Sequence, residues 1–144
     1  MPDQSVDDMK NLLPQRFPMV MVDSVVSCSG DTIITRLEIR DDNVFLSKGR
    51  LTAAGLIETV AQSAAARTGL LLRAGEGKAD GPVPVGVIGH VRNFRVFEQP
   101  TLGDVLHTEV KATHEIGQAS VVTGKVYTGE KLLAEGELKI FLTA

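Results

Sequence analysis

Several stretches of this chain alternate between apolar and polar residues, the pattern of a strand with one buried face. The clearest is residues 33–40. The side chains on its predicted buried face are those of Ile33, Thr35, Leu37 and Ile39. The preceding run, residues 18–28, is rich in β-branched residues and Met and predicts a first strand. Between the two runs, Ser29, Gly30 and Asp31 predict a turn.

Four more strand-like stretches fill the second half of the chain. They are residues 85–96, 104–116, 119–128 and 131–142. The connections after Ile116 and Thr128 are short, which is typical of hairpins and so of antiparallel pairing. The segment before these strands, residues 74–84, is rich in glycine and proline and predicts a loop.

Residues 51–72 are almost all apolar or small, which predicts a long buried helix. Glu58 is the one carboxylate inside this run, and Gly55, Ala61 and Ala65 are its neighbours at helical spacing. A buried carboxylate must find a partner, change its pKa or face a cavity. Glu58 is therefore the first candidate for chemistry; the alternative is a structural carboxylate paired with Arg67 or with a residue of the N-terminal turn.

With a short amphipathic helix at residues 6–13, the elements predict an α+β fold. About six antiparallel strands would wrap on one long central helix, in a single domain spanning residues 1–144. One helix covers only part of such a sheet, and its edges need covering, so we expect a dimer.

Composition narrows the function classes. The net charge of −3 argues against a nucleic-acid binder. A single cysteine, Cys28, and an acidic first segment without a signal peptide favour the cytoplasm. Glu58, Gln62 and Arg67 interrupt the apolar run, so we expect no membrane span. No paired Cys or His spacing indicates a metal site.

Several short motifs occur in an order that indicates a protein family. Residues 13–18 read LPQRFP and lead to Val22 and Asp23, and Glu58 is followed by Ala61 and Gln62. Residues 91–94 then precede Pro100 and the Gly103–Asp104 pair. In this the chain resembles the hotdog fold, and within it the (3R)-hydroxyacyl-acyl-carrier-protein dehydratase-like family. The resemblance implies a homodimer or an oligomer of dimers, acyl-thioester tunnels between subunits and Glu58 at the reacting end. It also implies an acyl carrier protein or coenzyme A thioester as the partner. We expect no cofactor.

The chain departs from this family in the loop before the central helix. Family dehydratases have a histidine there, followed by Phe; here Asn43 stands at that place, within one residue, and Phe45 follows. Histidine titrates near neutral pH, whereas asparagine can only form hydrogen bonds. Asn43 is therefore either a site residue or a cap of the strand end.

The candidate catalytic residues are Glu58, Asn43 and Gln62. The candidate substrate-binding residues are Phe45, Gly55, Ala54 and His90. The backbone N–H of Gly55 could hold a thioester carbonyl, or the glycine only permits close packing. His90 is the best of the three histidines as a substitute for the missing base.

Three functions remain open. The first is a dehydratase-like lyase acting on 3-hydroxyacyl groups of a carrier protein, in fatty-acid or polyene-type biosynthesis. The second is a thioesterase in which Glu58 activates water or attacks the thioester. The third is a non-catalytic subunit that binds an acyl chain or pairs with a histidine-bearing hotdog partner.

Overall fold

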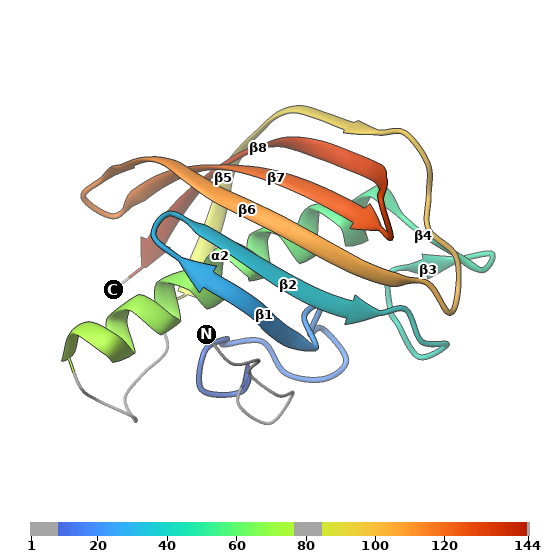
Figure 1. Cartoon of the computed structure of the whole chain (residues 1–144), viewed down its shortest axis with the longest axis horizontal. Helices are drawn as coiled ribbons and strands as arrows, with labels where there is room; N and C mark the ends of the chain where they lie inside the picture. Colours follow the sequence, from blue (N-terminus) through green and yellow to red (C-terminus); the bar gives the residue numbers. More distant parts are fainter. Residues whose placement is uncertain (1–8, 77–84, 144) are drawn as a thin grey trace.

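A computed structural model describes residues 9–76 and 85–143 of the chain (Figure 1). One long helix, α2 (Ala53–Glu76), lies along the concave face of a six-stranded antiparallel sheet. The strand order in the sheet is β1-β2-β6-β7-β8-β5. The strands are β1 (Ser24–Ser29), β2 (Thr32–Glu38), β5 (Val85–Val96), β6 (Val105–Ile116), β7 (Ala119–Thr128) and β8 (Lys131–Thr143). This confirms the predicted fold class.

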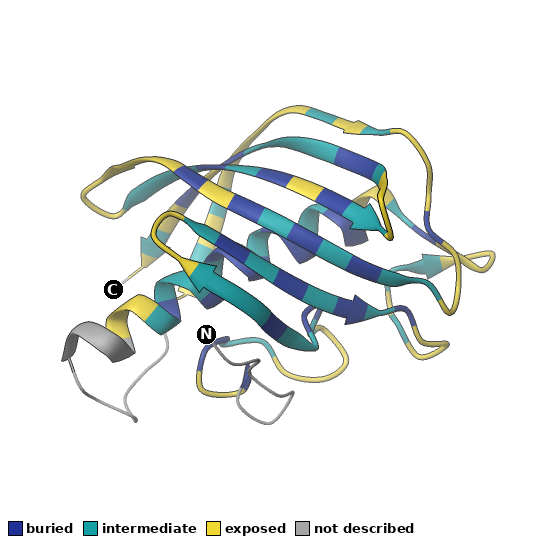
Figure 2. Ribbon diagram, viewed as in Figure 1, coloured by how far each residue is buried: buried dark blue, intermediate teal, exposed yellow. Residues whose placement is uncertain are grey.

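The predicted alternation of buried and exposed residues agrees with the structure where the pattern is most regular. Along β2 the side chains of Ile33, Thr35 and Leu37 are buried against the helix, and the residues between them are partly exposed (Figure 2). In β6 the alternation fails at one point, because a bulge lies between Ala112 and His114. Ile116, which the pattern placed on the buried face, is consequently 78% exposed.

The prediction of one strand over residues 18–28 was wrong in its first half, because β1 begins only at Ser24. The backbone of Met19 and Met21 bonds to side chains of α2 instead of to a strand. Gln62 Oε1 accepts from the N–H of Met21 at 2.6 Å, and its Nε2 donates to the carbonyl of Met19 at 2.7 Å. Thr59 Oγ1 donates to the carbonyl of Met21 at 2.8 Å. Helix side chains thus satisfy the polar groups that a neighbouring strand would otherwise satisfy.

Two other predicted segments reach beyond the described residues. Of the short helix at residues 6–13, only Met9 onward is described; Met9 begins a turn that buries Leu12 and Leu13. The predicted loop at residues 74–84 begins later than expected, since α2 continues to Glu76. Residues 77–84 lie outside the described part.

The helix and the sheet approach each other closely at a glycine. A Cβ atom added to Gly124 of β7 would lie 2.4 Å from Cγ1 of Val60. Side chains larger than hydrogen at this position would push the helix away.

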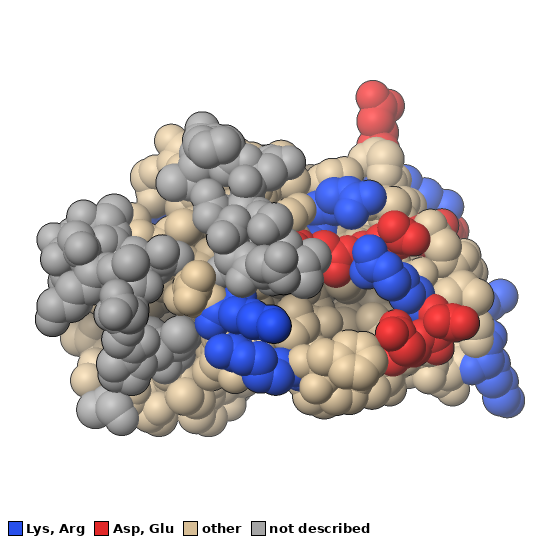
Figure 3. Space-filling view, turned by 90° about the horizontal axis from the view of Figure 1, so that it is seen from below, with Lys and Arg blue, Asp and Glu red and all other residues tan. Residues whose placement is uncertain are grey.

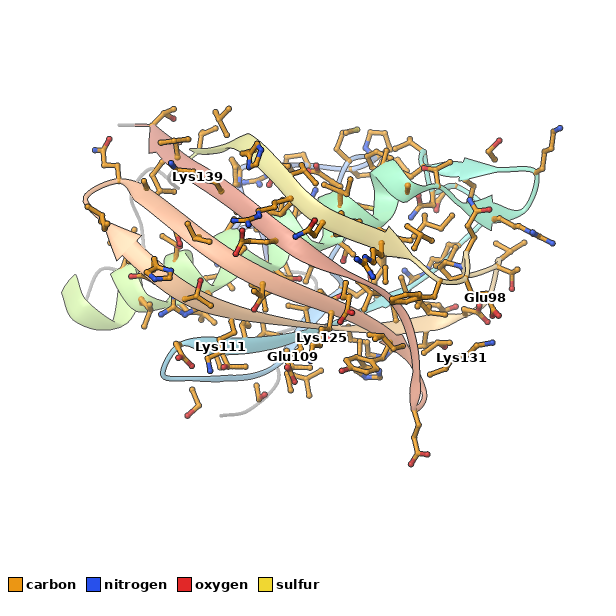
Figure 4. The ribbon with its side chains drawn as sticks, turned by 90° about the horizontal axis from the view of Figure 1, so that it is seen from above. Glu98, Glu109, Lys111, Lys125, Lys131 and Lys139 are labelled. Atoms are coloured by element: carbon orange, nitrogen blue, oxygen red, sulfur yellow. The ribbon has the colours of Figure 1, made fainter. Side chains whose placement is uncertain are left out.

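The outer face of the sheet is charged. Glu109 and Lys125 are cross-strand neighbours there, and Lys125 also lies opposite Glu135 (Figure 4). Neither α2 nor any other helix among residues 9–76 and 85–143 is long and apolar enough to cross a membrane.

Candidate active site

Glu58 lines a cavity of about 80 Å³ between α2 and the sheet. Helix α2 contributes the small side chains of Ala61, Ala64 and Ala65, which leave the space open. Opposite them, the sheet contributes apolar positions: Gly86, Ile88, Val110, Val122, Ile140 and Leu142. Glu58 is therefore a carboxylate on the wall of a narrow, mostly apolar cavity.

Gln62 holds the Glu58 carboxylate. Its Nε2 donates to Glu58 Oε1 at 3.0 Å, one helical turn away. The Gln62 side chain is 1% exposed and also bonds to the backbone of Met19 and Met21. Since a backbone N–H can only donate and a carbonyl can only accept, these two bonds determine which way the amide points. The amide therefore presents a fixed N–H to Glu58.

Arg67, the alternative partner of Glu58, forms an ion pair with another carboxylate. The Nη1 atom of Arg67 lies 2.6 Å from Glu115 Oε1, and the guanidinium also donates to the carbonyl of Gly30. No salt bridge to Glu58 forms among the described residues. The ion pair between Glu58 and Arg67 that the sequence left open does not form.

Asn43 lies in a different hollow, of about 300 Å³, beside the N-terminal segment and the start of the sheet. Its Oδ1 accepts from the N–H of Phe45 at 2.8 Å, and its Nδ2 lies 3.2 Å from Sδ of Met21. This is the capping geometry expected of Asn in a turn. The charged side chains around the hollow are of both signs, as Figure 3 shows for this face: Lys10, Arg16 and Arg40 with Asp23, Glu38 and Asp42.

The remaining candidates do not line the Glu58 cavity within one chain. The N–H of Gly55 is directed at Oγ1 of Thr52, 3.4 Å away, which caps the start of the helix. A Cβ at Gly55 would lie 2.8 Å from Cβ of Phe45, so this glycine permits close packing of the preceding loop. Ala54 is exposed, and His90 is exposed opposite Lys139 on the outer face of the sheet. A single chain thus joins only Glu58 and Gln62.

The structure adds Gln15, which the sequence showed only as part of the LPQRFP segment. Gln15 lines both the Glu58 cavity and the Asn43 hollow, and so lies between the two. The sequence feature that could have identified Gln15 as a cavity residue is its position in that segment, two residues after Leu13, which is buried. Within residues 9–76 and 85–143, no group of three His, Cys, Asp or Glu side chains is placed to hold a metal ion.

A protein family and several known relatives match almost the whole chain. The ApeP-like family, described as ApeP dehydratase, matches residues 7–144. The chain belongs to the ApeP-like family. It is also similar to the 3-hydroxyacyl-[acyl-carrier-protein] dehydratase FabZ of Natranaerobius thermophilus, with 29% identity over 145 residues that cover 96% of this chain and 97% of the relative.

Two solved structures place this ApeP-like chain in the hotdog fold. The dehydratase heterocomplex ApeI:P from Xenorhabdus doucetiae matches with a TM-score of 0.84 and 22% identity, over 94% of this chain and 91% of that one. A hypothetical thioesterase with coenzyme A from Streptococcus pneumoniae matches with a TM-score of 0.62 and 12% identity, over 83% and 84%. At these identities the likeness concerns the fold alone.

Proposed function

We propose that this ApeP-like protein takes part in dehydrating 3-hydroxyacyl groups carried on an acyl carrier protein. The observation that carries the proposal is the Glu58–Gln62 pair on the wall of an apolar cavity, in a chain whose family is described as a dehydratase. The similarity to a FabZ dehydratase supports the same reaction and the same kind of carrier.

Dehydration removes a proton from C2 and hydroxide from C3 of the acyl group. One group must accept the C2 proton, and one must donate a proton to the departing hydroxide, which then leaves as water. Glu58 supplies one of these groups. Gln62 keeps one oxygen of the carboxylate in place by its hydrogen bond, which leaves the other oxygen for the substrate.

The second group is not provided by the cavity of a single chain, since the described residues that line it include no histidine. We propose that a second hotdog subunit supplies it. A histidine-bearing partner fits this need, and the name of the ApeI:P heterocomplex shows that a structural relative assembles with a second component. A homodimer would instead bring a second copy of Asn43.

The edge strand β5 is the surface that we propose for this assembly. It pairs only with β8 among the described strands, so its outer backbone groups are free to pair with another chain. Gly86 and Ile88 of the same strand also line the Glu58 cavity. A subunit joined at β5 would therefore lie close to Glu58.

Mass spectrometry of a 3-hydroxyacyl carrier protein tests the reaction. The carrier is incubated with this protein alone, with a histidine-bearing hotdog partner alone, and with both. We expect the carrier to become lighter by one water only in the mixture. Glu58→Gln should reduce the rate by about 10²-fold or more, the usual contribution of a proton-transferring group.

Glu109→Gln is the matched control, because Glu109 lies on the outer face of the sheet, away from the cavity. It should leave the rate of water loss unchanged. Full activity of Glu58→Gln in the mixture would refute the role of Glu58. Water loss catalysed by the protein alone would refute the need for a second kind of subunit.

The thioesterase alternative has less support. It needs a backbone N–H beside Glu58 for the oxyanion, yet the Gly55 N–H is directed at Thr52 and Gly55 is not part of the cavity wall. In the same experiment, a bare carrier with free acid would indicate hydrolysis in place of dehydration.

A further inference from the structure

The Glu58 cavity runs along the helix α2. The helix residues in its wall begin at Glu58, continue through Ala61 and Ala65, and end at Arg67 and Thr68. An α-helix rises by about 1.5 Å per residue, so Arg67 lies about 13–14 Å beyond Glu58 along the helix axis. An acyl tail that fills the cavity from Glu58 therefore extends toward Arg67.

A second hollow, of about 230 Å³, adjoins the far end of this cavity, beside the β6–β7 turn. Among the described residues, four line both spaces and so form the boundary between them: Arg67, Thr68, Ser120 and Leu142. Three of these side chains are polar, and that of Arg67 is charged. The mostly apolar cavity thus ends at a polar boundary.

The Arg67 side chain is held in place. Its Nη1 donates to Glu115 Oε1 at 2.6 Å, and its Nε and Nη2 donate to the carbonyl of Gly30 at 3.4 and 3.3 Å. The β1–β2 turn and the end of β6, which carry these partners, lie toward the end of the molecule where α2 ends (Figure 1). The Arg67 side chain is only 11% exposed. An apolar tail that displaced it would leave a largely buried charge without its partners, which is costly.

The volume of the Glu58 cavity also favours a short tail. It is about 80 Å³, whereas pockets that enclose a drug-sized ligand measure about 300–1,000 Å³. A long tail would need the adjoining hollow as well. To reach that hollow it must pass Arg67.

We propose that Arg67 limits the length of the acyl tail that this protein accepts. The inference rests on the proposed function, which places the reacting carbons beside Glu58. Tail carbons between Glu58 and Arg67 leave water for apolar surroundings, and this stabilises binding. Carbons beyond Arg67 gain nothing, because they meet a fixed charge. Arg67 takes no part in proton transfer; it determines specificity.

Titration calorimetry with a series of acyl carrier proteins tests the length limit. The carriers bear saturated chains from hexanoyl to hexadecanoyl, which cannot be dehydrated because they lack the 3-hydroxyl. Burial of one methylene group raises affinity by up to about 4-fold. We expect affinity to rise with each added carbon among the shorter chains and to stop rising once the tail reaches Arg67.

Three variants test whether Arg67 causes the limit. Arg67→Met keeps an unbranched stem without the charge, so affinity should continue to rise and exceed the wild-type value for hexadecanoyl by about 10-fold or more. Arg67→Lys keeps a charge and should keep the limit. Arg36→Met is the matched control, because Arg36 lies on the outer face of β2, between the buried Thr35 and Leu37; it should also keep the limit.

Several outcomes would overturn the proposal. One is an affinity that rises up to hexadecanoyl in the wild-type protein, a result that needs no variant to fold. Another is an unchanged limit in Arg67→Met. Affinity that is independent of tail length throughout would mean that the tail does not enter the cavity. The length limit then fails, but water loss in the mass-spectrometry experiment would still support the proposed function; without water loss, both fail.

Discussion

At the scale of single residues, Gln62 links the fold to the candidate chemistry. It bonds to the backbone of Met19 and Met21 and to the carboxylate of Glu58. Gln62→Leu leaves a buried N–H and a carbonyl without partners, so the free energy of unfolding should fall by about 2–4 kcal/mol. Urea denaturation measures this. Gln118→Leu, at an exposed turn, should change it by less than about 0.5 kcal/mol; an equal effect of the two variants would contradict the prediction.

Cys28 allows a prediction about pH. Burial raises the pKa of the Cys28 thiol above its ordinary value, and the charge of Arg67 opposes this shift. Between the ordinary and the raised pKa, the unfolded thiol has lost its proton while the folded thiol keeps it. The stabilising contribution is therefore present below the ordinary pKa and lost as the pH rises above it.

The same shift should slow alkylation of Cys28. Iodoacetamide reacts with the thiolate, so the rate for the folded protein should rise at a higher pH than the rate for the unfolded protein. Arg67→Gln should move the folded profile to still higher pH, because it removes the opposing charge. Rate profiles that coincide for folded and unfolded protein would show that the thiol is not shifted.

At the scale of elements, the contact between α2 and β7 depends on Gly124. A methyl group there would overlap Val60, so Gly124→Ala should lower the free energy of unfolding by about 1–3 kcal/mol. Val60→Ala removes the overlapping methyls. In the double variant the cost of Gly124→Ala should therefore be smaller than in the wild-type background, as a double-mutant cycle would measure. Additive effects would show that the two residues do not press on each other.

The elements also show where a sequence pattern stops being informative. Regular alternation predicted β2 and the bounds of β5 to β8 to within a residue or so. It failed at residues 18–23, where the backbone of Met21 bonds to Gln62 and Thr59 of a helix more than 35 positions later. It failed again after Ala112, where a bulge reverses the parity of the strand. The first departure depends on partners that are distant in sequence, and the second on a bulge within the β6–β7 hairpin that alternation does not show.

At the scale of the whole molecule, the proposed assembly depends on the β5 edge. Val87 lies on this strand and is 51% exposed. A charge there should oppose strand pairing and the burial of the edge, so Val87→Glu should prevent the complex with the histidine-bearing partner from forming. Light scattering coupled to gel filtration measures the mass of the species in the mixture. Ile116→Glu, at the exposed end of β6, should leave the complex intact; loss of the complex in this control would point to another interface.

The sequence by itself determined the fold class and singled out Glu58 and Gln62 as candidate site residues. Periodicity sufficed for the strands, since a half-buried strand must alternate wherever it is regular. An apolar run with one carboxylate singled out Glu58, because burying a charge is costly unless it serves a purpose or has a partner. The motifs around it indicated the hotdog dehydratase-like family, which the match over residues 7–144 confirmed.

Only the tertiary structure decided which candidates meet. Asn43 and Glu58 lie in different hollows, and His90 lies on the outer face of the sheet. Arg67 forms an ion pair with Glu115, and Gln15 lines the Glu58 cavity. The contacts of Gln15, His90 and Arg67 join residues that lie 40 or more positions apart. They depend on how the N-terminal segment and the sheet pack around α2, and such distant contacts leave no periodic signal in the sequence.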